Sequence, residues 1–308
     1  MSVLRATGGA SSGRTAGPGA AGGPAPDRAG SAAPGSARAS GGVAVGGRLR
    51  AYAARIVPPL VLLAIILAAW EAAVRVFDIP FYILPAPSRI AGVLAGDRAL
   101  LLGEAAVTLG EVMLGFAIAF VVGVVLALAI FSSRTVERAV YPLVIASQTV
   151  PVFAIAPLLV VWFGYGTLSK IVMAALIVFF PIVVNTVDGL RAADPDMVNL
   201  LVILGAGPAE IVRRVRVPAA LPFVFSGTRI AIATSVIGAV IGEWVGSTRG
   251  LGYLMIHANA QLHVDLVFAV IVYLSVMATA LFWTVSLVEW AALPWRRAET
   301  AAQADGEG

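Results

Sequence analysis

The sequence predicts an all-α protein that crosses a membrane several times, with six transmembrane helices. Of its 308 residues, 59% are hydrophobic and only 12% are charged, which is about half the charged share of a typical soluble domain. The mean hydropathy is +0.93. Six apolar stretches are each long enough to cross a hydrocarbon core of roughly 30 Å as a helix. Water cannot solvate so apolar a surface, so we expect lipid to be its solvent.

The six predicted spans are separated by shorter and more polar segments, and two of the spans are expected to be interrupted. In the third span, Pro142, Pro151 and Pro157 remove backbone donors that lipid cannot replace. In the fourth span, Pro181 is followed by the polar Asn185. The spans lie near residues 57–76, 104–131, 140–162, 168–188, 219–243 and 264–290.

The distribution of basic residues predicts the orientation of the chain in the inner membrane. Residues 1–50 contain 35 Gly, Ala, Ser or Pro residues, a composition typical of a disordered tail because it offers little apolar area to bury. If this tail is cytoplasmic, the inside segments hold 15 of the Lys and Arg residues and the outside segments hold five. The positive-inside rule therefore places both termini, including a second tail at residues 291–308, in the cytoplasm.

Several kinds of chemistry are excluded by composition. The chain has no cysteine and only two histidines, His257 and His263, so a thiol nucleophile is impossible and we expect no metal site. Its only lysine, Lys170, does not lie in a GxxxxGK[ST] phosphate-binding motif, so the chain does not hydrolyse ATP itself. The basic residues lie in short runs between apolar segments, which is typical of membrane topology and not of nucleic-acid binding. We therefore expect a non-enzymatic protein without a cofactor.

The loop between the fourth and fifth spans, residues 189–217, is the longest connection between spans. It contains an apolar helical turn or two at residues 197–204, a break at residues 205–208, and a second helix at residues 209–217 that carries Arg213, Arg214 and Arg216. An amphipathic helix of this kind either lies on an anionic membrane surface or docks into a groove on a soluble partner. The sequence alone leaves both interpretations open. Pro218 is expected to begin the fifth span.

This loop resembles the EAA loop of the permeases of binding-protein-dependent ABC importers. The family pattern is Glu-Ala-Ala, three residues, Gly, nine residues, an aliphatic residue, one residue and Leu-Pro. Here the same spacing joins Asn199-Leu200-Leu201, Gly205 and the segment from Val215 to Pro218. The spacing matches throughout, but the Glu-Ala-Ala start is replaced.

Other segments extend the resemblance from about Ile56 to Trp290. They look like the branch of these permeases that imports sulfonates, taurine, nitrate and thiamine precursors. The resemblance implies the type I importer transmembrane fold. It also implies a first helix and external segment at residues 51–103 and an ABC transmembrane domain at residues 104–290. The segments are Ile83–Ile90, Thr108–Leu128, Gln148–Lys170, Phe179–Arg191 and Glu243–Met255.

The resemblance further implies a permease subunit that a separate ATPase dimer drives through the cytoplasmic loop. An external binding protein would deliver the solute, and a second permease copy would complete the pathway in the lipid bilayer; no nucleic-acid partner is expected. Gly205 would allow the tight turn that presents the docking helix. The residues expected to couple the loop to the ATPase are Asn199, Leu200, Leu201, Gly205, Ala206, Gly207, Glu210, Val215 and Pro218.

Polar and aromatic residues in or beside the spans are candidates for the solute pathway, because polar groups are costly in lipid and often functional. Each also has an ordinary interpretation, as a helix–helix hydrogen bond, a packing aromatic or an interfacial residue. An ion-driven secondary transporter remains the alternative function, although no repeated halves with matching broken helices are visible. The sequence does not name the solute. The pathway candidates are Gln148, Thr149, Phe153, Trp162, Asn185 and Glu243.

Overall fold

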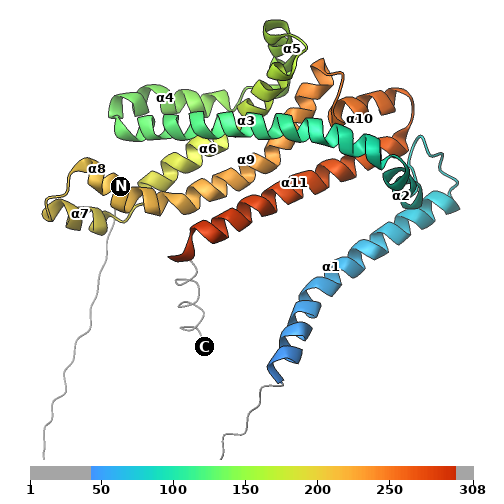
Figure 1. The fold of residues 1–308 in the computed structure, drawn as a ribbon, viewed down its shortest axis with the longest axis horizontal. Coiled ribbons are helices and arrows are strands. Elements are labelled where there is room, and N and C mark those ends of the chain that lie inside the picture. Colours follow the sequence, from blue (N-terminus) through green and yellow to red (C-terminus); the bar gives the residue numbers. More distant parts are fainter. Residues whose placement is uncertain (1–42, 296–308) are drawn as a thin grey trace, which may run out of the picture. The chain divides into compact units, whose positions relative to one another are not determined.

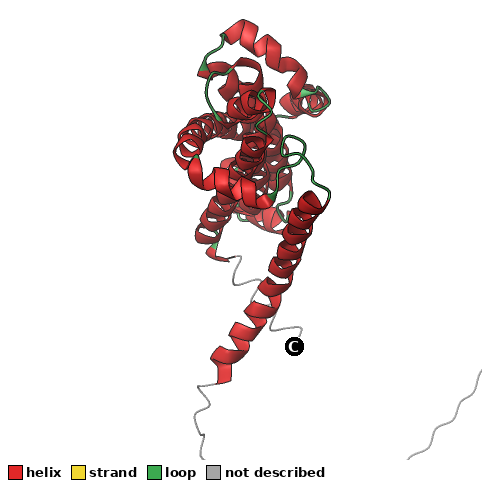
Figure 2. Cartoon of the chain, turned by 90° about the vertical axis from the view of Figure 1, so that its right-hand side faces the viewer, coloured by secondary structure: helices red, strands yellow, loops and turns green. Residues whose placement is uncertain are grey.

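The computed structural model describes residues 43–295, and side chains from Val57 to Trp295. Every regular element in this part of the chain is a helix (Figure 1, Figure 2), which confirms the predicted all-α class. The helices are α1 (Val43–Val76), α2 (Pro87–Gly96), α3 (Arg98–Ser132), α4 (Arg134–Ser147), α5 (Val152–Phe163), α6 (Thr167–Arg191), α7 (Pro195–Ile203), α8 (Pro208–Ile211), the π-helical η1 (Val212–Arg216), α9 (Val217–Gly246), α10 (Leu251–Ala260) and α11 (Val264–Ala292).

The chain divides into two units between Pro58 and Pro59. The structure describes only the first part of α1 from the first unit. The tail predicted from composition includes residues 43–50, which are helical because α1 begins at Val43. Residues 1–42 of that predicted tail, and residues 296–308 at the other end, lie outside the described residues. All contacts reported below lie within the second unit.

The number of candidate membrane crossings agrees with the sequence prediction. Within the described residues, five helices are long and apolar enough to cross a membrane, and a sixth crossing results if α4 and α5 are one bent span. The third predicted span, residues 140–162, is this bent pair. The other five predicted spans fall within Val57–Val76, Arg98–Ser132, Thr167–Arg191, Pro208–Gly246 and Val264–Ala292.

The predicted interruption of the third span occurs at only one of its three prolines. α4 and α5 meet at a bend of 100°, and Pro151 is the N-cap residue of α5. Pro142 and Pro157 lie inside their helices. A proline has no N–H to continue the helix that precedes it. At Pro151 the chain instead turns through the preceding residues, where the amides of Thr149 and Val150 donate to carbonyls three residues earlier.

The predicted interruption of the fourth span was wrong, because α6 runs without a break through Pro181. A proline inside a helix removes one backbone hydrogen bond and crowds the carbonyl four residues earlier. Tertiary packing offsets this cost in α6, since Ile182 and Val183, which follow Pro181, are almost fully buried. The Asn185 side chain donates a hydrogen bond of 2.8 Å to the Pro181 carbonyl. The asparagine side chain is therefore bonded within its own helix.

α6 lies at the centre of the helical packing, between α3 and α9. Glycines allow these three helices to approach closely. A Cβ atom at Gly115 of α3 would lie 2.7 Å from the Ala174 Cβ of α6, and one at Gly238 of α9 would lie 2.8 Å from the Ala174 Cα. Small residues at such positions let helix backbones come close together and gain dispersion contacts. Ala174 is thus enclosed from both sides, and it is fully buried.

We expect Gly238→Val to lower the free energy of unfolding by about 1–3 kcal/mol, because the new side chain meets the backbone of α6. The measurement is the melting temperature of the purified protein in detergent. Gly110→Val is the matched control, since a Cβ atom at this α3 glycine meets nothing within 4 Å. Equal losses in the two variants would show that the close approach of α6 and α9 is not the cause of the effect.

Candidate functional site

The loop between α6 and α9 contains a short helix, α7, whose apolar side chains are not buried. α7 begins after Asp194, whose carboxylate accepts a hydrogen bond of 2.9 Å from the Asp196 amide, and Pro195 occupies its first turn. Such a cap and a proline at the first position favour a helix start. None of the α7 residues is buried, and Ile203 is 81% exposed. Met197, Leu200, Val202 and the C-cap residue Leu204 are exposed as well.

α7 ends in a turn that requires a left-handed residue. Gly205 has a φ angle of +82°. Its amide donates to the Val202 carbonyl at 3.0 Å, and the Ala206 amide donates to the Leu201 carbonyl at 2.9 Å. This is the Schellman arrangement, in which a glycine after the helix allows the last carbonyls to be satisfied. A Cβ atom at Gly205 would meet nothing within 4 Å, so the backbone angle, and not crowding, accounts for glycine here.

The second half of the loop is continuous with the fifth span. α9 begins at Val217 with Pro218 in its first turn, as predicted, but the helix does not restart there. A single helical segment runs from Pro208 to Gly246 and includes one π-helical turn, η1. At the end of η1 the Val217 amide donates to the Val212 carbonyl, five residues earlier. The wider turn precedes Pro218, which has no N–H to donate and whose ring would crowd a regular α-helix. The π turn therefore lets the helix continue through a proline.

The loop contacts the bundle at the ends of α3 and α6. Arg216 lies over the Phe131 ring at 4.9 Å and donates to the Leu190 carbonyl at 3.3 Å. A hollow of about 900 Å³ lies between the end of α3 and the loop. It is lined by Leu128, Ala129, Phe131, Ser132, Val198, Val202, Ala206, Pro208, Ala209, Ile211, Val212 and Arg216.

The structure places all of the predicted coupling residues on the continuous stretch from α7 to the start of α9. Their exposure differs along it. Asn199, Leu200, Gly205 and Gly207 are exposed. Leu201, Ala206, Glu210, Val215 and Pro218 are half-buried.

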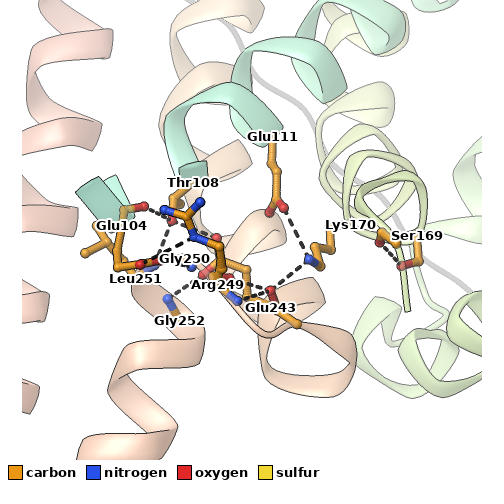
Figure 3. Close-up of polar contacts among 12 residues, drawn as sticks. Glu104, Thr108, Glu111, Ser169, Lys170, Glu243, Arg249, Gly250, Leu251 and Gly252 are labelled. Carbon is orange, nitrogen blue, oxygen red and sulfur yellow. Dashed lines mark hydrogen bonds and ion pairs between the residues drawn. The ribbon is translucent and has the colours of Figure 1, made fainter. Parts of the chain in front are cut away.

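A second polar site lies at the other end of α9, inside the protein (Figure 3). Glu243 of α9 is 1% exposed. One of its carboxylate oxygens accepts a hydrogen bond of 2.7 Å from the Thr108 hydroxyl of α3, and the other accepts one from the Gly252 amide at the start of α10. The Thr108 hydroxyl in turn accepts a 2.8 Å bond from the Leu251 amide. Glu243 and Thr108 thus hold the N-terminus of α10 against α3 and α9.

The chain's only lysine completes this cluster. Lys170 of α6 lies 3.4 Å from a carboxylate oxygen of Glu111 on α3, and it donates a 2.7 Å hydrogen bond to the Ser247 hydroxyl. Both Lys170 and Glu111 are buried. An ion pair away from water depends on its partner, because an uncompensated buried charge is very costly. We call these four side chains, Thr108, Glu111, Lys170 and Glu243, the buried polar cluster.

The loop from α9 to α10 fits against this cluster through backbone groups. The Gly250 amide donates to Glu104 at 2.5 Å, and Gly250 has a φ angle of +106°. A Cβ atom at Gly250 would overlap the Glu243 carboxylate, so this position needs glycine both for its backbone angle and for space. Of the cluster, the sequence singled out only Glu243 as a site residue. The sequence signal available for Thr108, Glu111 and Lys170 was that each is a polar residue within an apolar span.

Comparison with known proteins identifies the family. The protein-family model described as "Binding-protein-dependent transport system inner membrane component" matches residues 119–291, which is more than half of the chain. The chain belongs to this family.

Several relatives of this chain are named as permeases. A probable ABC transporter permease of Haemophilus influenzae is 42% identical over 231 residues, which is 75% of this chain and 94% of the relative. The formylaminopyrimidine transport permease ThiX of Halalkalibacterium halodurans is 38% identical over 78% of this chain and 96% of the relative. Permeases named for aliphatic sulfonates in Bacillus subtilis and for taurine in Escherichia coli are 32% and 29% identical. The predicted branch of the ABC permeases is confirmed.

A solved structure confirms the predicted type I fold. The inward-facing MetNI methionine ABC transporter matches with a TM-score of 0.56 and 20% sequence identity, over 63% of this chain and 97% of that chain. At this level of identity the likeness shows the fold alone.

The pathway candidates of this ABC permease do not form one group. Gln148 and Thr149 are exposed at the bend between α4 and α5. Phe153, the second residue of α5, lines a hollow of about 550 Å³ together with Trp244 of α9. Trp162 is exposed at the far end of α5.

The two remaining pathway candidates lie apart from the α4–α5 bend. Asn185 is bonded to its own helix through the Pro181 carbonyl, near the end of α6 that leads to α7. Glu243 belongs to the buried polar cluster at the opposite end of α9. In the described conformation, both side chains make hydrogen bonds within the protein.

Proposed function

We propose that the chain is the membrane-spanning permease subunit of an ATP-driven importer. It forms the pathway for a small solute that an external binding protein delivers. A separate ATPase dimer drives the conformational change of the permease by binding the segment from α7 to η1. The observation that carries this proposal is α7, a helix followed by a defined turn, on which Met197, Leu200, Val202 and Ile203 are exposed in the described chain.

The chemistry of α7 favours a protein partner. A helix of nine residues with an exposed apolar surface is unstable alone in water and gains most by burying that surface in a groove. Docking on a groove also requires a rigid presentation, which Asp194 at the start of α7 and Gly205 after it provide. The sequence left open whether this part of the loop lies on the membrane surface or docks on a soluble partner. The exposed apolar side chains of α7 favour docking, which is the interpretation that we propose.

The helix that follows α7 can transmit a displacement into the membrane. From Pro208 to Gly246 there is no break, so a force on α8 acts directly on the fifth span. The contacts of Arg216 with Leu190 and Phe131 link the same movement to α6 and α3. Tightly packed helices of this kind move as units and do not deform continuously.

The proposed orientation places α7 in the cytoplasm, with both termini on the same side. This end of the bundle carries Arg134, Arg138, Arg191, Arg213, Arg214 and Arg216, as the positive-inside rule requires. The opposite end, with α2 and α10, then faces the binding protein. A second copy of the chain completes the solute pathway, and Gln148, Thr149 and Phe153 at the bend of the third span are the pathway residues that we propose. The identity of the solute is fixed by the binding protein.

The test is recovery of the ATPase with the permease. The genes next to that of the permease should encode an ATPase and a binding protein, and co-expressed ATPase should co-purify with the affinity-tagged permease. In the double variant Leu200→Asp and Ile203→Asp, we expect ATPase recovery to fall about tenfold or more, because two exposed apolar anchors become charged. The amount of permease in the membrane should not change.

Leu262→Asp is the matched control for the docking variant. Leu262 is also an exposed leucine, 61% accessible, but it lies in the loop between α10 and α11, at the proposed external end. This variant should recover the ATPase as the wild type does. If the wild-type chain recovers no ATPase and solute uptake follows an ion gradient, the protein is a secondary transporter and the proposal is wrong.

A further inference from the structure

A second feature of the α7 end is a hollow beside α4 that none of the functions above uses. It has a volume of about 500 Å³ and is lined by Arg134, Glu137, Arg138, Tyr141 and Pro142. These residues recur every three or four positions, so they share one side of the helix. The hollow is therefore a strip along the first two turns of α4.

The charges around this hollow do not balance. Its only acidic residue, Glu137, is already paired with Arg191 at 2.5 Å, and the Arg191 guanidinium also lies 5.1 Å from the centre of the Tyr141 ring. Arg134 and Arg138 are both exposed, and neither has a hydrogen-bond or ion-pair partner in the described part of the chain. Two guanidinium groups one helical turn apart are thus left in excess, and the hollow fits an anion.

The rest of α4 shows the depth at which this hollow lies in the membrane. Past Pro142 the exposed side chains are apolar, with Leu143 68% and Ile145 43% accessible. The other side of α4 packs into the bundle through Val136, Val140 and Val144. The surface of α4 therefore changes from charged to apolar within one turn of Tyr141. Tyrosine is enriched at the boundary between lipid headgroups and hydrocarbon. An anion at the hollow lies at the level of lipid phosphates.

We propose that the hollow binds the phosphodiester headgroup of an anionic phospholipid. The guanidinium groups of Arg134 and Arg138 hold the phosphate oxygens, since the planar fork of arginine matches phosphate with paired hydrogen bonds. The acyl chains lie along Leu143 and Ile145. Basic pockets at the edge of helix bundles have this chemistry in general. The site does not depend on the role of α7, and its loss would leave ATPase docking unchanged.

The experiment measures lipid retention by the purified full-length protein. Wild-type protein is equilibrated with equal amounts of phosphatidylglycerol and phosphatidylcholine in detergent, and bound lipid is counted by native mass spectrometry. We expect phosphatidylglycerol to be retained preferentially. In the double variant Arg134→Gln and Arg138→Gln, that preference should fall about twentyfold, because two charges at the membrane surface are lost. Equal retention of the two lipids by the wild type overturns the proposal.

The matched control is the double variant Arg98→Gln and Arg213→Gln, which loses the same charge elsewhere. Both of these arginines are exposed and neither has a partner in the described structure. The control variant should retain phosphatidylglycerol as the wild type does. If it loses as much phosphatidylglycerol as the Arg134→Gln and Arg138→Gln variant, net charge and not this hollow causes the effect. A separate arm adds inorganic phosphate: displacement of the lipid by millimolar phosphate would show that the site is for a free anion. Retention of lipid only when ATPase is absent would assign the hollow to an acidic protein surface.

Discussion

Replacing Lys170 with methionine is expected to be among the most destabilising single changes in the chain. Lys170 is the cation beside Glu111, at 3.4 Å, and the two side chains are only 8% and 1% exposed. Removing one member of a buried pair leaves the other charge uncompensated, at a cost of about 3–5 kcal/mol. The Ser247 hydroxyl also loses the 2.7 Å hydrogen bond that Lys170 donates. The measurements are the yield of monodisperse protein and its melting temperature in detergent, and both should fall sharply.

A second substitution should reverse most of this loss. In the double variant Lys170→Met and Glu111→Gln, no unpaired charge remains on the α3–α6 side of the cluster, so stability should return to within about 1–2 kcal/mol of the wild type. The control Arg249→Met removes a longer ion pair, in which the Arg249 side chain is 63% exposed and lies 3.6 Å from Glu104. It should change the free energy of unfolding by less than about 1 kcal/mol. If the double variant is no more stable than Lys170→Met alone, the charge of Glu111 is not what Lys170 compensates.

The parts of the fold that were predictable from the sequence are those that depend on local patterns. The apolar stretches follow from the thickness of the bilayer, and the five continuous spans and the bent third span lie where those stretches predicted them. The turn at Gly205 was also predictable, because a glycine after an apolar helical turn is the ordinary signal for a left-handed C-terminal residue. Both features are set by residues within a few positions of each other.

The prolines show where local reasoning fails. Pro151 is the N-cap residue of α5, Pro181 lies inside α6, and Pro218 lies in the first turn of α9. Inside a helix a proline costs about 3 kcal/mol or more, whereas at a helix start it is tolerated. The buried packing of α6 compensates for Pro181, and the π turn before Pro218 joins α9 to the helical turns that precede it. That compensation depends on distant helices and on a change of helical register, and neither is visible in a window of sequence.

The buried polar cluster was beyond prediction for the same reason. Thr108 and Glu243 are 135 positions apart and share a 2.7 Å hydrogen bond. Each residue taken alone has an ordinary interpretation as a polar group within a span. Only the three-dimensional packing of α3, α6 and α9 shows that they meet, and that Glu243 satisfies the backbone of α10. The candidate coupling loop was readable because its residues are contiguous in sequence.

Replacing Gly205 with valine should separate ATP hydrolysis from solute transport. A β-branched residue is strongly disfavoured at a φ angle of +82°, at a cost of about 1–3 kcal/mol. The turn that presents α7 would then be populated in only a small fraction of molecules. In proteoliposomes that contain the ATPase and the binding protein, we expect uptake to fall about tenfold or more, while the amount of inserted permease and the ATP hydrolysis of the ATPase persist.

Two substitutions at the same turn show whether the backbone angle is the cause. Gly205→Asn should retain most of the uptake, because asparagine tolerates the left-handed region better than other residues with a side chain. Gly207→Val introduces the same valine two positions further on, where φ is −74° and a Cβ atom also meets nothing within 4 Å. Valine adopts that extended conformation readily, so uptake should stay near the wild-type rate. If Gly207→Val and Gly205→Val fail equally, added volume at the ATPase surface is responsible, and the left-handed turn has no special part in coupling.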